Sequence, residues 1–118
     1  MKFTRRHLAA LVPALAAGQA KTRMQLPSRC YKYEDLPVKK NGENESRDIF
    51  DGLTHNNTQV DIHMTSLGPG MMPHPPHHHV HEEMVMLRSG ELDVTIEGKT
   101  TRVTAGSVVY VHSNEEHG

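Results

Sequence analysis

The sequence predicts a small all-β fold, an antiparallel barrel or sandwich. From Thr58 onward, short stretches of alternating apolar and polar residues recur between turn residues, with no helical period among them. The chain has 118 residues, so we expect one domain at most, and its 9 glycines and 7 prolines favour short strands and turns. Because only 36% of the residues are hydrophobic and there is no Trp, the core is expected to be thin.

The first twenty residues have the pattern of an export signal. Arg5 and Arg6 precede the apolar run Leu8–Ala17, and small residues follow up to Ala20. The run is far shorter than the ~20 apolar residues of a membrane-spanning helix, so no stable membrane span is expected. The paired arginines resemble a twin-arginine signal, which predicts a periplasmic protein. A general secretory signal or an ordinary amphipathic helix is the alternative.

Residues 21–58 show no clear period, and we expect them to form an N-terminal arm that packs on the barrel or on a second subunit. Within this arm, Asn41–Asp48 has the composition of a polar loop with an Asn-Gly turn, and Asp51–Gly52 indicates a second turn. Cys30 is the only cysteine and is expected to be a free thiol, because one cysteine cannot form an internal disulfide. The formal net charge of −1 provides no basic surface for nucleic acid.

Residues 59–118 are expected to form the barrel domain. Extended segments are separated by Gly-containing turns at 67–70, 88–90, 98–99 and 105–106. The expected extended segments are 60–66, 77–79, 83–87, 92–96, 101–103 and 107–111. The spacing is too short for helices between strands, which favours antiparallel pairing.

A histidine-rich stretch precedes one of these strands and suggests a metal site. His77 and His79 are two residues apart, so on an extended segment both imidazoles point to one side. A turn around Val80–Glu82 would then place Glu83 on a neighbouring strand, beside the pair. Two ring nitrogens and a carboxylate oxygen suit a divalent transition metal. A solvated polar turn or a flexible metal-sequestering tract is the alternative.

The spacing of these residues resembles the first motif of the cupin superfamily. That motif is Gly, five residues, His-x-His, three or four residues, Glu, six residues and Gly. His77, His79, Glu83 and Gly90 fit it, and Gly70 stands one residue further away than the pattern requires.

The second cupin motif follows in order, as Gly, five residues, Pro-x-Gly, two residues and His. Gly106 and His117 fit, whereas His112 stands at the Pro position and Asn114 at the Gly position, so that turn departs from the pattern. The resemblance covers roughly residues 59–118. It implies a double-stranded β-helix, or jelly-roll barrel, with the metal ligands His77, His79, Glu83 and His117.

The resemblance also implies a class of chemistry. One divalent metal, which could be Mn, Fe, Ni, Zn or Cu, would leave open coordination positions on such a ligand set. A 2+ ion and one carboxylate give a formal charge of about +1, which favours an anionic small-molecule substrate or ligand. The expected function is a metal-dependent enzyme of the dioxygenase or isomerase/decarboxylase type, acting on a small organic acid or phenol. A non-catalytic metal or small-molecule binding module is the alternative, and a metal-free structural barrel is a third interpretation.

Cupin barrels usually continue for about two strands beyond the second-motif histidine. Here the sequence ends one residue after His117, so this side chain could also be frayed. Either the further strands lie outside this sequence, leaving the barrel incomplete at its C-terminal edge, or another subunit covers the open edge. We therefore expect a homodimer.

The remaining histidines and the methionines of this domain are expected to have other roles. The histidines His74, His78, His81 and His112 are interpreted as surface or rim residues, and the alternative for His81 is to hold a metal ligand in place. The methionines are expected in the core and pocket lining, with a soft copper site as the alternative. They are Met64, Met71, Met72, Met84 and Met86.

Overall fold

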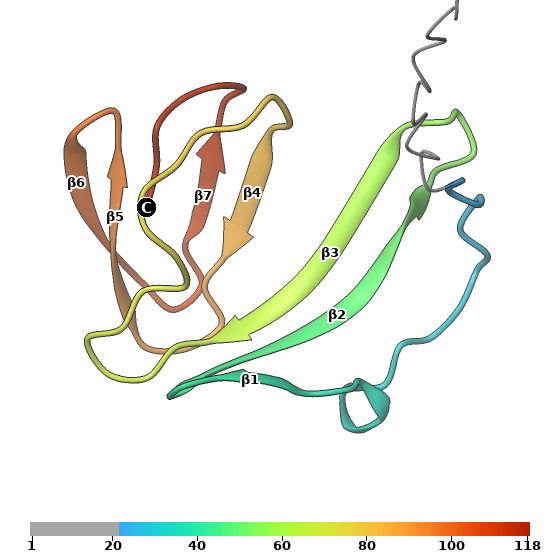
Figure 1. The fold of residues 1–118 in the computed structure, drawn as a ribbon, viewed down its shortest axis with the longest axis horizontal. Coiled ribbons are helices and arrows are strands. Elements are labelled where there is room, and N and C mark those ends of the chain that lie inside the picture. The colour runs from blue at the N-terminus through green and yellow to red at the C-terminus, as the bar shows by residue number, and fades with distance from the viewer. Residues whose placement is uncertain (1–21) are drawn as a thin grey trace, which may run out of the picture.

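The computed structural model describes residues 22–118, so the predicted export signal at residues 1–20 lies outside the described part of the chain. The described residues form seven β-strands and one 3-10 turn, η1 (Tyr33–Asp35), which confirms the predicted all-β class. Figure 1 shows a long three-stranded sheet on one side and two short strand pairs on the other. No helix within residues 22–118 is long and apolar enough to cross a membrane.

The long sheet is antiparallel and has the order β1-β2-β3. It consists of β1 (Lys39–Asn41), β2 (Asn44–Leu53) and β3 (Gln59–Ser66). The predicted Asn-Gly turn is confirmed, because Gly42 connects β1 to β2 with a φ of 59°, a conformation that glycine adopts without steric cost.

Two expectations for this region were wrong. The predicted polar loop ends at Asn44, where β2 begins, and the predicted turn at Asp51–Gly52 lies inside the same strand. The cause is tertiary, because β2 pairs with β3 from Glu45 opposite Ser66 to its end, apart from a bulge between Asp48 and Phe50. The hydrogen bonds of this ladder outweigh the low strand propensity of a polar sequence.

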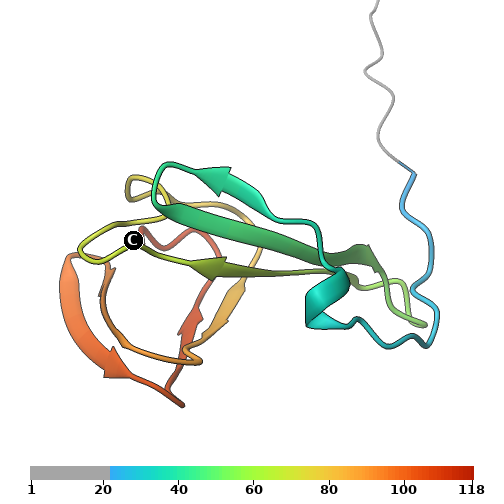
Figure 2. The same ribbon diagram turned by 90° about the horizontal axis from the view of Figure 1, so that it is seen from below.

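The two short strand pairs lie side by side in the C-terminal half. The first joins β4 (Glu83–Met86) to β7 (Val108–Val111), and the second joins β5 (Glu91–Ile96) to β6 (Lys99–Thr104). Figure 2 shows both pairs curving around a common interior, as expected for a jelly-roll barrel. Among the described residues the three sheets are not joined into one continuous ladder, so the barrel is open.

The β5–β6 hairpin differs from the prediction by one residue. The turn is formed by Glu97 and Gly98, with φ values of 46° and 77°, and Lys99 already belongs to β6. Two successive positive φ values are typical of the type I′ turn, whose twist matches that of the flanking strands.

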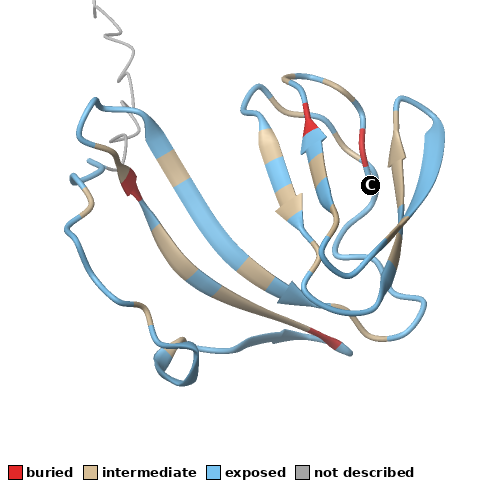
Figure 3. Cartoon of the chain, turned by 180° about the vertical axis from the view of Figure 1, so that it is seen from behind, coloured by how far each residue is buried: buried red, intermediate tan, exposed pale blue. Residues whose placement is uncertain are grey.

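The core is as thin as the composition predicted. Val111, which is 3% exposed, is the only buried hydrophobic residue within residues 22–118. Figure 3 shows how few positions are buried. The alternation along β4 leaves Glu83 and Val85 half-buried, so Met84 and Met86 are exposed.

The predicted core role of the methionines was therefore largely wrong. Of the five, only Met64 is partly buried. The other four are exposed, namely Met71, Met72, Met84 and Met86.

Candidate metal centre

The predicted histidine pair lies on an extended segment, and the end of the chain holds that segment in place. The amide of His77 donates to the carbonyl of His117 over 3.0 Å, and the amide of His117 donates back to His77 over 2.9 Å. The amide of Asn114 donates to the carbonyl of His79 over 2.8 Å. The predicted bend is also confirmed, because the chain turns at Val80 and His81 before β4 begins at Glu83.

The other side of this terminal segment pairs with β5. Thr95 and Gly118 exchange two backbone hydrogen bonds of 2.8 and 3.0 Å, and the amide of Glu97 donates to the carbonyl of Glu116 over 2.8 Å. His117 therefore lies between two extended neighbours and is 7% exposed. The alternative of a frayed side chain is wrong, because hydrogen bonds on both sides fix its backbone.

The four predicted ligands come together. His77, His79, Glu83 and His117 each offer one ligand atom, and these atoms all lie within 4.8 Å of one another. Oε2 of Glu83 is 3.2 Å from Nε2 of His79 and 3.3 Å from Nε2 of His117. At a metal–ligand distance of ~2.1 Å, adjacent ligand atoms would be about 3.0 Å apart and opposite ones about 4.2 Å apart. The four atoms therefore surround a space of the size that a transition-metal ion needs.

The hydrogen bonds of two rings direct their Nε2 atoms towards this space. Nδ1 of His79 lies 2.8 Å from the carbonyl oxygen of His81, and Nδ1 of His117 lies 2.9 Å from that of Glu115. A carbonyl can only accept, so in both rings Nδ1 carries a proton. This is the arrangement in which a histidine presents Nε2 to a metal.

Unpartnered nitrogens give the strongest indication that an ion fits here. Nε2 of His77 and Nε2 of His117 are buried and have no hydrogen-bond partner. Leaving a buried polar atom unpaired costs free energy, and proteins rarely do so without a reason. A bound cation would accept a lone pair from each nitrogen.

The pKa of His77 agrees with a ligand role. Partial burial lowers this pKa below its ordinary value, and the neighbouring rings of His74, His117 and His79 lower it further, whereas Glu83 opposes them. A lowered pKa favours the neutral ring, which is the form that binds a metal.

The four other histidines of this region are exposed, as predicted, but two of them contact candidate ligands. They are His74, His78, His81 and His112. The ring of His74 stacks on that of His77, with centroids 3.9 Å apart and an interplanar angle of 16°. The ring of His81 stacks on that of His79, with centroids 3.6 Å apart and an angle of 6°. The contact of His81 agrees with the alternative that this residue holds a metal ligand in place, whereas the sequence offered no signal for the stack of His74 beyond the density of histidines.

In the unusual second motif, Asn114 adopts the backbone conformation that the usual glycine would adopt. Asn114 has a φ of 63°, in the left-handed region. Asn is several-fold enriched there among non-glycine residues, so it can replace the usual glycine at modest cost. The departure from the cupin pattern therefore does not displace His117.

Sequence reasoning missed a residue that anchors the loop before the histidine pair. Asn44, at the start of β2, is 7% exposed. Its Nδ2 donates to the carbonyl of Met72 over 2.9 Å, and its Oδ1 accepts from the amide of Gly68 over 3.1 Å. The partners are 24 and 28 residues away, so no local pattern could have indicated them.

An apolar hollow lies next to the candidate metal centre. Its volume is about 350 Å³, in the range of small-molecule pockets. Ile96 lines it and is also the bridge partner of His117, so the hollow and the ligands share one face of the barrel. Its walls come from β5, β6 and β7, namely Val94, Ile96, Lys99, Thr101, Val103, Val108 and Val109.

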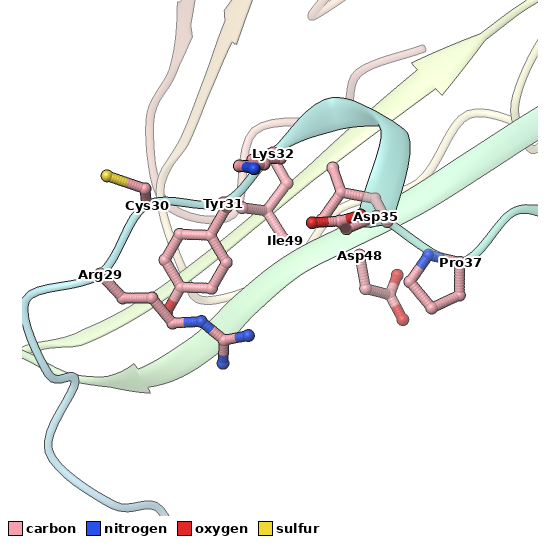
Figure 4. Close-up of a pocket in the computed structure, with 9 residues that line it drawn as sticks. Arg29, Cys30, Tyr31, Lys32, Asp35, Pro37, Asp48 and Ile49 are labelled. Carbon is pink, nitrogen blue, oxygen red and sulfur yellow. The ribbon is translucent and has the colours of Figure 1, made fainter.

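A second hollow lies around η1 and has a volume of about 190 Å³ (Figure 4). It contains none of the four candidate ligands. Cys30 lines it and is an exposed free cysteine. The residues around it carry both charge signs, including Arg29, Lys32, Asp35 and Asp48.

The comparisons with known proteins cover the part of the chain that holds this centre. Residues 63–118 match the family model described as "Cupin domain". No curated protein and no solved structure matches the chain. The matched region contains all four candidate ligands, and both motifs with their connecting strands. The match, the β-fold and the His/Glu group together support placing residues 63–118 in the cupin superfamily.

Proposed function

We propose that this protein is a small exported metal-binding cupin, and that it is a metal-dependent enzyme acting on a small organic acid or phenol. The observation that carries the metal proposal is the convergence of three imidazoles and one carboxylate, with the Nε2 atoms of His77 and His117 buried and unpaired. Such buried nitrogens cost free energy in a purely structural barrel and gain a partner when an ion is present.

His77, His79, Glu83 and His117 would hold the ion through three Nε2 atoms and one carboxylate oxygen. A divalent ion bound there would act as a Lewis acid that stabilises negative charge on a coordinated substrate oxygen. Backbone bonds to the C-terminal segment fix the histidines, and the valine-lined hollow beside Ile96, the bridge partner of His117, would receive the apolar part of a substrate. The reaction class is dioxygen insertion, isomerisation or decarboxylation.

Lys99 supports an anionic ligand. It lies opposite Ile96 in the β5–β6 register, and Ile96 is the bridge partner of His117, so the three side chains follow one another across the same face. An ammonium group at the edge of an apolar hollow would attract a carboxylate or phenolate. Lys99→Met should therefore weaken binding of such anions, and Lys99→Arg should weaken it less.

The test begins with the metal. Protein purified without a His-tag is analysed for Mn, Fe, Ni, Zn and Cu, and the loaded forms are incubated with small carboxylates, diphenols and diketones, with and without air. Metal-dependent turnover that is lost in Glu83→Ala would support the enzyme. Stoichiometric metal without turnover would favour the second candidate, a non-catalytic binding module, which the further exposed histidines His74, His78 and His81 beside the ligands in sequence also favour. The absence of metal binding would refute both.

Export and dimerisation complete the proposal. Arg5 and Arg6 support twin-arginine export to the periplasm, and a reporter fusion that is still exported after both are changed to Lys would contradict that route. A homodimer is supported by the outer face of β4 and β7, where Met84 lies opposite Tyr110 and both side chains, like that of Met86, are more than half exposed. A monomeric mass by light scattering would refute the dimer.

A further inference from the structure

The three candidate histidine ligands are not oriented in the same way. His79 and His117 each have an Nδ1 atom within hydrogen-bond distance of a backbone carbonyl, which fixes the plane of the ring and the direction of Nε2. Within residues 22–118, His77 has no such partner for either ring nitrogen. Something else must hold the plane of this ring if its Nε2 is to face the ion.

The contact that replaces the missing hydrogen bond is a stacked ring. His74 lies over His77 with a centroid separation of 3.9 Å and an angle of 16°, so the two planes are nearly parallel. Rotation of the His77 ring about its Cβ–Cγ bond would break this stack. Aromatic pairs of this kind are worth roughly 0.5–1.5 kcal/mol.

His74 is itself held firmly enough to serve as a support. Its Nδ1 lies 3.0 Å from the carbonyl oxygen of Pro75, which anchors the ring to its own backbone. Pro75 and Pro76 separate the two histidines, and proline fixes φ, so the spacing between the rings has few ways to change. We propose that His74 is a positioning residue of the metal centre, which orients His77 by ring stacking and does not itself bind the ion.

The chain provides a matched comparison in His81. This ring stacks on His79 even more closely, at 3.6 Å and 6°. His79, however, also has its Nδ1 bonded to the backbone carbonyl of His81, and that carbonyl survives replacement of the side chain. Removing the His81 ring should therefore matter less than removing the His74 ring. His78, which lies between the two ligands and is exposed, provides a neutral control.

The positioning role of His74 rests on the proposed metal site, so the experiment distinguishes failure of the metal site from failure of the positioning role. Cu²⁺ affinity is measured by competition with a chelator, and the electron paramagnetic resonance spectrum of the Cu²⁺ form is recorded, for the full chain and for His74→Ala, His74→Phe, His81→Ala and His78→Ala. Failure of the parent to bind Cu²⁺ with His77 as a ligand would refute the metal site and the inference together.

If the parent binds, His74→Ala should weaken binding by about 2- to 10-fold, the range expected for loss of one aromatic pair, and should alter the spectrum. His74→Phe retains a flat ring between the same prolines, although it lacks the Nδ1 contact with Pro75, and should recover most of the lost affinity and the parent spectrum. His81→Ala and His78→Ala should stay close to the parent. An unchanged affinity in His74→Ala, or a loss that His74→Phe does not restore, would overturn the positioning role while leaving the metal site intact.

A measurement on the metal-free protein tests the stack directly. The ring protons of His77 lie against the face of His74, so their NMR signals should carry a ring-current shift that His74→Ala removes and His74→Phe retains. Signals that do not respond to His74→Ala would refute the stack. Because His74 is exposed, His74→Ala should lower the melting temperature of the metal-free protein by no more than the loss of this stack explains, and His74→Phe should recover the difference.

Discussion

Replacement of His117 by Ala tests the metal centre at its most distant ligand. The three other ligands lie within seven residues of one another, whereas His117 is supplied by the C-terminal segment, 34 residues after Glu83. Its Nε2 is buried, has no hydrogen-bond partner and lies 3.3 Å from Oε2 of Glu83. The change removes one of four ligand atoms while the backbone bonds to His77 and β5 can remain.

The expected magnitude follows from the linkage between binding and stability. An ion present at 100 times its Kd stabilises the folded state by about 2.7 kcal/mol, which raises the Tm of a domain of this size by ~10–20 °C. Loss of a hydrogen-bond partner that orients a metal-binding histidine costs 10- to 100-fold in affinity, so loss of a ligand itself should cost about 100-fold or more. At the same ion concentration the ion would stabilise the folded variant by only about 0.4 kcal/mol, which corresponds to a rise in Tm of only ~2–3 °C.

The assay is the difference in Tm with and without the ion, so any effect of the substitution on the metal-free protein cancels. His112→Ala is the matched control, because His112 lies nearby in the same segment, is exposed, and has its Nδ1 near the carbonyl of Ser113. A metal-dependent shift in His117→Ala as large as in the parent would refute the four-ligand site. An equal loss in His112→Ala would show that the whole segment, and not the ligand, is responsible.

Three further predictions concern the anchor, the second motif and pH. Asn44→Ala removes two part-buried hydrogen bonds, to the amide of Gly68 and the carbonyl of Met72, and should cost about 2 kcal/mol in the free energy of unfolding, measured by urea denaturation; an effect below ~0.5 kcal/mol would contradict the anchor. Asn114→Ala should cost about 1 kcal/mol because Ala tolerates a φ of 63° poorly, whereas Asn114→Gly should stay near the parent; equal effects would refute the conformational argument. Because partial burial and the neighbouring rings of His74, His117 and His79 lower the pKa of His77 below its ordinary value of about 6.5, the unfolded chain binds more protons than the folded one at mildly acidic pH. The metal-free protein should therefore lose stability as pH falls below ~6.5, and metal binding should persist somewhat below ~6.5 and then fail; metal content that stays constant from about pH 8 to 5 would contradict the histidine ligands.

The features that the sequence predicted are local ones. The β5–β6 hairpin follows from alternation between Leu92 and Ile96 and from a Gly-containing turn, both of which lie within a dozen residues. The histidine pair, the bend and Glu83 depend in the same way on short-range spacing. His117 was found only through the family resemblance, because nothing near it indicates which segment it joins.

The features that escaped prediction depend on partners distant in sequence. The polar residues at the start of β2 have little strand propensity, and they form a strand because β3 supplies the ladder. Asn44 becomes buried through a loop that follows more than twenty residues later. The stack of His74 on His77 depends on side-chain rotamers beyond two prolines, which no periodicity specifies.

The position of His117 between β5 and the histidine pair has a consequence for protein synthesis. His77, His79 and Glu83 leave the ribosome almost together, so three of the four candidate ligands would be available to an ion before β5, β6 and β7 are made. The fourth ligand arrives only after 34 more residues, when closure of that loop adds the last bond and completes the pairing with β5. A metal bound early would then serve as a template on which the segment that carries His117 docks. Refolding in the presence of the ion should therefore be faster than refolding in its absence, and His117→Ala should abolish the difference.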